Sequence, residues 1–122
     1  MKAGAFISPC GIYRYLLTRE WEADVKRSAL FVMLNPSTAD ASLDDPTIRR
    51  CISFAKMFQC NRLAVVNLFG LRSTDPRALK KDIDPVGPQN DFIVRNECMY
   101  HASSGGLIIA AWGSHKMAKQ RS

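Results

Sequence analysis

The chain has 122 residues, so its length favours one domain, residues 1–122, that can bury a core without disulfides or metals. Its 17 basic and 11 acidic side chains give a net charge of +6, which favours a polyanionic partner such as nucleic acid. No apolar run reaches membrane-spanning length, and the N-terminus lacks the apolar core of a signal peptide. We therefore expect a cytoplasmic protein without a membrane partner.

The first predicted elements are two strands and a helix. Residues 11–21 are rich in aromatic and β-prone side chains, which predicts an edge strand or hairpin arm. The continuous apolar run at residues 29–34 predicts a strand buried on both faces. The pair Asp45-Pro46 then predicts a helix start, since Asp caps and Pro fits the first helical position. Its apolar face would comprise Ile48, Cys51, Ile52, Ala55 and Phe58.

The second half of the chain continues this alternation. Residues 63–66 predict a second buried strand, and Asp75-Pro76 predicts a short helix through Lys80. A further helix is expected from Pro88 to the stop at Gly105-Gly106. Residues 107–112 predict a third buried strand. The apolar positions of that last helix would include Phe92, Val94, Met99 and Ala102.

Strands that alternate with helices predict an α/β fold with a short parallel sheet between helical layers. In such sheets, ligands bind beyond the carboxyl ends of the strands. Asn35, Asn67 and the segment 112–114 follow the three predicted strands. The sequence therefore predicts a site at this edge, centred on Asn35.

The loop after the first buried strand is the richest candidate. Asn35 can hold a water or a base edge, although an amide does not titrate and is no strong base. Pro36 fixes the strand exit, and Ser37 and Thr38 offer hydroxyls and amides to an anion. A plain turn held by these side chains is the alternative.

Charged candidates follow in the same region. Asp40 and Asp44 are candidates to orient a water or hold a ribose, unless they are simply solvated loop carboxylates. Arg49 and Arg50, in the first turns of the helix, are candidates for phosphate contacts or for a solvated face.

Asn67 ends a strand, and its amide can either read a nucleobase edge or satisfy itself on backbone. The remaining candidates lie in later loops: Arg72, Gly113 and Ser114 for substrate, and His115 and Lys116 for nucleic acid.

The four cysteines form no CxxC pair, and the only histidines are His101 and His115. We therefore expect reduced packing cysteines, no metal site and no cofactor.

Five segments resemble an uncharacterised bacterial and phage family, domain of unknown function 1643. They are YRYLLTREW, LFVMLNPSTADASLDDPTIRRC, VVNLFGLRSTDP, DPVGPQND and AAWG. The resemblance spans nearly the whole chain, and it implies no known activity.

A more distant likeness is to the uracil-DNA glycosylase superfamily. Residues 34–37 (LNPS) resemble the motif whose Asn or Asp positions the attacking water, and residues 65–68 (VVNL) resemble the strand whose Asn reads the base. Residues 111–114 (AWGS) are similar to the turn that precedes the last motif. The glycosylases add a final strand and a His-containing loop, so we expect that the chain is truncated at its C-terminus.

These observations favour a DNA glycosylase-like domain that binds or excises a nucleobase, flipped into the pocket. One alternative is a non-catalytic factor that binds nucleic acid or protein in phage–host conflict, as an inhibitor or defence component. Another is a binder of free nucleotides or nucleosides. With a strand absent, the exposed sheet edge also predicts a homodimer.

Overall fold

The computed structural model describes residues 1–22, 24, 27–36, 38–72 and 84–113. Its centre is a five-stranded mixed sheet with the strand order β1-β2-β4-β3-β5. The strands are β1 (Lys2–Ile7), β2 (Arg14–Glu20), β3 (Ser28–Met33), β4 (Arg62–Asn67) and β5 (Leu107–Ala111).

The three predicted strands are confirmed as β3, β4 and β5, and they run parallel. The burial predicted for the third is wrong, because β5 lies at the edge of the sheet and its residues are half-buried or exposed. Met33 lies opposite Asn67 on one side and opposite Ala111 on the other. The carboxyl ends of these strands therefore form one common edge, which we call the C-terminal edge.

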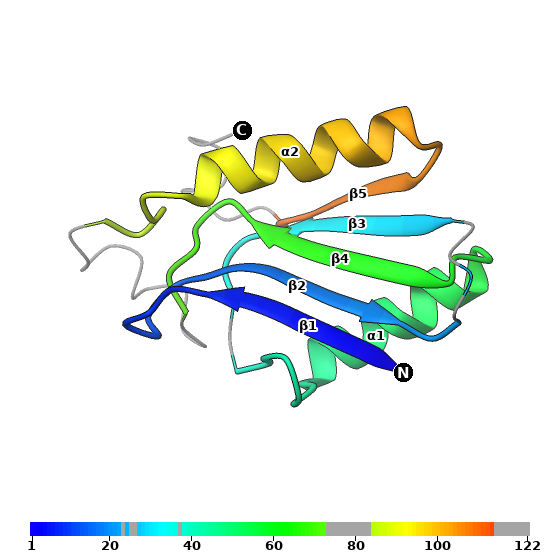
Figure 1. Ribbon diagram of the computed structural model, residues 1–122, viewed down its shortest axis with the longest axis horizontal. Coiled ribbons are helices and arrows are strands. Elements are labelled where there is room, and N and C mark those ends of the chain that lie inside the picture. Colours follow the sequence, from blue (N-terminus) through cyan, green and yellow to red (C-terminus); the bar gives the residue numbers. More distant parts are fainter. Residues whose placement is uncertain (23, 25–26, 37, 73–83, 114–122) are drawn as a thin grey trace.

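The sheet is not purely parallel, because the N-terminal region adds an antiparallel hairpin of β1 and β2. The predicted hairpin arm is confirmed as β2. It is not an edge strand, since it lies between β1 and β4 (Figure 1). Strand β1 was not predicted, because its KAGAFI sequence combines small residues with weak alternation and its side chains are exposed or half-buried.

Helix α1 (Pro46–Met57) begins where the sequence predicts. The side chain of Asp45 accepts a 2.9 Å hydrogen bond from the main-chain N–H of Ile48, which caps the first turn. The predicted apolar face is buried at Ile48, Cys51, Ile52 and Ala55, whereas Phe58 is 46% exposed.

Helix α2 (Asn90–Ser103) begins two residues after Pro88 and ends before Gly105, whose φ of 76° favours glycine. The predicted apolar face is wrong at Phe92 and Met99, which are 68% and 63% exposed, and at Ala102, which is also exposed. The helix is rotated away from that pattern because it buries polar residues with partners on the sheet. Its buried residues are Asn90, Ile93 and His101.

The two helices lie on opposite faces of the sheet (Figure 1). The α1-side core contains Phe31 and Val65, and the α2-side core contains Val32 and Val66. Successive side chains of β3 and of β4 therefore point to opposite faces of the sheet, one into each core. A glycosylase-like arrangement stays a prediction.

Three of the four cysteines pack as predicted: Cys51 and Cys60 are buried in the α1-side core, and Cys98 packs against the α2-side core. Cys10 is exposed, so the packing prediction is wrong there. The predicted helix at residues 75–80 lies outside the described residues. In the part of the chain that is described, neither helix has the length and apolarity needed to cross a membrane.

Candidate functional site at the C-terminal edge

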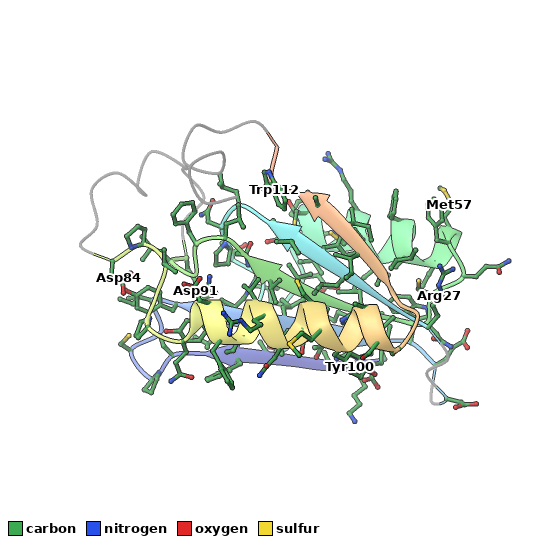
Figure 2. The ribbon with its side chains drawn as sticks, turned by 90° about the horizontal axis from the view of Figure 1, so that it is seen from above. Arg27, Met57, Asp84, Asp91, Tyr100 and Trp112 are labelled. Carbon is green, nitrogen blue, oxygen red and sulfur yellow. The ribbon has the colours of Figure 1, made fainter. Side chains whose placement is uncertain are left out.

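The loops that follow β3, β4 and β5 all leave the sheet at the C-terminal edge. The chain beyond β4 stays beside the chain beyond β3, because the N–H groups of Leu68 and Phe69 donate to the carbonyl oxygens of Met33 and Leu34. Figure 2 places Trp112, beyond β5, and Asp91, near the start of α2, toward this edge, whereas Arg27 and Met57 lie toward the opposite edge. The structure thus brings the predicted strand ends together.

Asn67, the last residue of β4, is only 1% exposed. Within the described residues, neither Nδ2 nor Oδ1 of its side chain has a hydrogen-bond partner. Asn67 is in phase with Leu63 and Val65, which belong to the α1-side core, so its side chain points toward that face. A buried amide with both atoms unpaired is uncommon in folded proteins and calls for an explanation.

The main chain of Asn67 is held from the other face. The Asn90 side chain, at the start of α2, donates to the carbonyl oxygens of Asn67 at 2.7 Å and Leu68 at 3.2 Å. Asn90 is fully buried. The role of Asn90 is therefore to fix the chain at the end of β4, and the sequence analysis did not identify it.

Arg14, at the start of β2, is a second buried polar residue at this edge, with 2% of its surface exposed. Its Nη1 donates a 3.0 Å hydrogen bond to the carbonyl oxygen of Ala39. Burial lowers the pKa of Arg14 to about 10, although the nearby Asp45 carboxylate raises it. Arg14 was not among the site residues predicted from the sequence.

The segment between β3 and α1 covers the α1-side face of this edge. Asn35 is half-buried, and its Nδ2 donates to the carbonyl oxygen of Pro36 at 3.2 Å. Pro36 and Ala39 are buried, whereas Thr38 is exposed. Asn35 and Asn67 thus lie at one edge, as the sequence predicts, and the catalytic role of Asn35 stays a prediction.

The Asp40 carboxylate organises this loop. Its Oδ1 accepts hydrogen bonds from the N–H groups of Ser42 at 2.9 Å and Leu43 at 2.8 Å. These hydrogen bonds lower the pKa of Asp40. Such an arrangement is an Asx turn, which accounts for Asp40 by local structure.

Arg19 on β2 ties the same loop to the sheet. Its Nε donates to Oδ1 of Asp44 at 2.8 Å, and its Nη2 donates to the carbonyl oxygen of Asp40. The Arg19 side chain is 2% exposed and that of Asp44 is 31% exposed. Asp44 therefore anchors a buried guanidinium, and the sequence analysis overlooked Arg19 as its partner.

Two of the remaining predicted site residues, Arg72 and Gly113, lie within the described part of the chain. Arg72 bridges to the N-terminal hairpin, where its Nη1 donates to the carbonyl oxygen of Gly11 at 3.3 Å. Gly113 is exposed, with φ of 71°. Ser37, Ser114, His115 and Lys116 lie outside the described residues.

Arg49 and Arg50 are exposed on α1. A groove of about 310 Å³ runs between α1 and β5, with Arg50 on its wall. Its other walls are mainly apolar and comprise Phe31, Met33, Thr47, Cys51, Phe54, Ile109 and Ala111.

At the opposite edge of the sheet, His101 is fully buried. Its Nδ1 donates to the carbonyl oxygen of Glu97, so its Nε2 accepts from the hydroxyl of Ser28, both at 2.8 Å. Arg62 donates to the same hydroxyl at 2.9 Å. Burial lowers the pKa of His101. This network fastens the end of α2 to the start of β3, far from Asn67.

No local signal in the sequence separates these buried polar residues from surface ones, because each has at least one partner that is distant along the chain. Among the described residues, no group of three His, Cys, Asp or Glu side chains gathers closely enough to hold a metal ion.

The comparisons with known proteins place the chain in one family. No curated protein and no solved structure matches the chain significantly. The sequence does match the family described as "Protein of unknown function (DUF1643)" over residues 14–122, which include β2 to β5 and both helices. The chain belongs to the DUF1643 family.

Proposed function

We propose that this protein binds a nucleobase at the C-terminal edge and that the side chain of Asn67 hydrogen-bonds to the edge of the base. The observation that carries the proposal is the side-chain amide of Asn67, which is 1% exposed and unpaired within the described residues. An unsatisfied buried polar group costs about 1–3 kcal/mol of stability. A ligand that pairs with both amide atoms would remove this cost.

An amide suits a base edge because it offers one donor side and one acceptor side next to each other. Nucleobases present the same combination, which is why Asn pairs with bases in two hydrogen bonds. The position at the end of a parallel strand is also where ligands bind in α/β sheets. Asn67 is 1% exposed, so its side chain has to become accessible when a base binds.

Base excision is an extension of this proposal. Hydrolysis of an N-glycosidic bond adds water to C1′ of the sugar, and the base leaves with a proton. Asn35 would hold the water, since its amide can orient a water but cannot take its proton. The carboxylates of Asp40 and Asp44 are engaged in the loop turn and with Arg19, so binding is the primary proposal.

DNA is the proposed source of the base. The net charge of +6 supports a polyanionic partner. Arg49 and Arg50 are exposed on α1, which starts at the C-terminal edge. Binding through such side chains would weaken as salt rises, because each phosphate contact releases counterions.

The test is equilibrium binding of single bases, nucleosides and short DNA across a salt series. We expect base-dependent binding that Asn67→Leu abolishes and that the matched variant Asn61→Leu, at the start of β4, retains. Binding that Asn67→Leu leaves intact, or no binding of any base, would refute the proposal. Excision is tested separately: Asn35→Ala should abolish base release, and unchanged release would remove Asn35 from the mechanism.

A further inference from the structure

Arg14 brings a second unused hydrogen-bonding group to the same edge. Its guanidinium is buried, and one nitrogen is committed to the carbonyl oxygen of Ala39 at 3.0 Å. Its Nε has no acceptor in the part of the chain that the structure describes. A buried charged donor without an acceptor is costly, so the position is unexpected for a purely structural residue.

Arg14 and Asn67 lie on the same face of the sheet. Ala39, which receives the hydrogen bond of Arg14, packs in the α1-side core together with Val65. Asn67 follows Val65 by two residues and points to the same side. Their strands, β2 and β4, are neighbours in the sheet. The N–H of Arg14 also donates to the carbonyl oxygen of Gly70 at 2.9 Å, just beyond Asn67.

Arg14 also contacts the loop between β3 and α1, through the carbonyl oxygen of Ala39. The charge of Arg14 interacts with the charges of Asp45, which caps α1, and of Arg72 and Arg19. The Asp45 carboxylate is committed to the main-chain N–H of Ile48 as a helix cap, at 2.9 Å. A ligand that reaches Asn67 thus enters the surroundings of Arg14.

The Asn67 amide and the Arg14 guanidinium differ in which ligand atoms they can bind. An amide can rotate by a half turn and exchange its donor and acceptor, so Asn67 accommodates either pattern on a base. A guanidinium has only donors and stays protonated at neutral pH. The atom that meets Arg14 must therefore be an acceptor.

We propose that Arg14 is a specificity-determining residue that selects bases with an oxo group and rejects those with an amino group at that position. This inference rests on the proposed nucleobase function. An oxo oxygen would accept the free N–H of Arg14. An amino group would place donor against donor and leave both unpaired inside the protein, which disfavours the complex strongly.

The experiment compares ligands that differ at one exocyclic group: hypoxanthine with adenine, and uracil with cytosine, each as free base and nucleoside. Calorimetric titration of the unmodified protein should give a preference of about tenfold or more for the oxo member of each pair. Binding is then measured for two variants, Arg14→Lys and Arg14→Gln, after their folding is checked by circular dichroism.

The two variants separate recognition from support of the loop. Lysine also has only donors, so Arg14→Lys should keep the oxo preference. Glutamine can turn its oxygen toward an amino group, so Arg14→Gln should bind both members of a pair within about threefold. If the unmodified protein binds both members equally, or if Arg14→Gln keeps the full preference, the role of Arg14 is overturned and base binding by Asn67 stands. If no base binds, both are overturned.

Discussion

The side chain of Asn90 donates a 2.7 Å hydrogen bond to the main-chain carbonyl oxygen of Asn67. One asparagine thus fixes the backbone of another, whose own side chain is buried on the opposite face without a partner among the described residues. The backbone at the end of β4 is therefore fixed while the Asn67 side-chain amide is unpaired among the described residues, and a fixed backbone is what a recognition group requires.

Replacement of Asn90 by Ala should lower the free energy of unfolding by about 2–3 kcal/mol, because two buried carbonyl oxygens lose their donor. Denaturant titration of the variant measures this loss. Asn96→Ala, on the exposed side of the same helix, is the matched control and should change stability by less than about 0.5 kcal/mol. Equal effects of the two substitutions would contradict the anchoring role of Asn90.

Asn67→Leu should raise the free energy of unfolding by about 1–2 kcal/mol while it removes base binding, since an apolar side chain replaces unsatisfied polar atoms. Asn61 provides the contrast. Its Oδ1 accepts from the main-chain N–H of Arg27 at 3.0 Å, and its Nδ2 donates to the carbonyl oxygen of Asp24 at 3.0 Å. Asn61→Leu should therefore destabilise by about 2 kcal/mol. A comparable destabilisation by Asn67→Leu would mean that its amide supports the fold.

Arg19→Met should lower the free energy of unfolding by about 2–3 kcal/mol, because the loop carbonyl oxygens and Asp44 lose a buried charged donor. Asp44→Asn should cost less than about 1 kcal/mol, since the Asp44 side chain is 31% exposed and screened by water. Thermal and denaturant unfolding of both variants tests this order. A larger loss for Asp44→Asn would show that the ion pair, rather than the carbonyl contacts, secures the loop.

We expect the protein to lose stability in mild acid, because His101 is buried in the folded chain. Burial holds its folded-state pKa below the ordinary value of 6.5, so below that pH the unfolded chain binds a proton that the folded chain rejects. The free energy of unfolding should be level above the unfolded-state pKa and fall as pH decreases toward the folded-state pKa, by at most about 1.4 kcal/mol per pH unit. His101→Gln should remove this fall, with Arg62 and Glu97 left in place around it. Parallel stability curves for the two proteins between about pH 7 and pH 5 would refute this role.

Local chemistry in the sequence determined much of the fold. Apolar runs predict β3 and β4 because strands buried on both faces have no polar positions. The run at β5 predicts its place but not its burial, since β5 is an edge strand with half-buried and exposed residues. The pair Asp45-Pro46 predicts the start of α1 because a cap and the first helical φ angle are properties of neighbouring residues. The motifs also led to the DUF1643 family, which the comparison confirms over residues 14–122. Because parallel strands share their carboxyl edge, the sequence also predicted that Asn35 and Asn67 lie at the same edge of the sheet.

Only the tertiary structure decided which polar side chains are buried and which of them are satisfied. Arg14 binds Ala39 and Arg19 binds Asp44, each 25 residues away, and His101 binds Ser28, 73 residues away. No local pattern in the sequence announces these long-range contacts. The buried face of α2 was also decided by the tertiary structure. It contains Asn90 and His101, which have polar partners on the sheet, and not the apolar positions Phe92 and Met99. For Asn67, the sequence left two alternatives open, and the structure leaves its side-chain amide unpaired among the described residues.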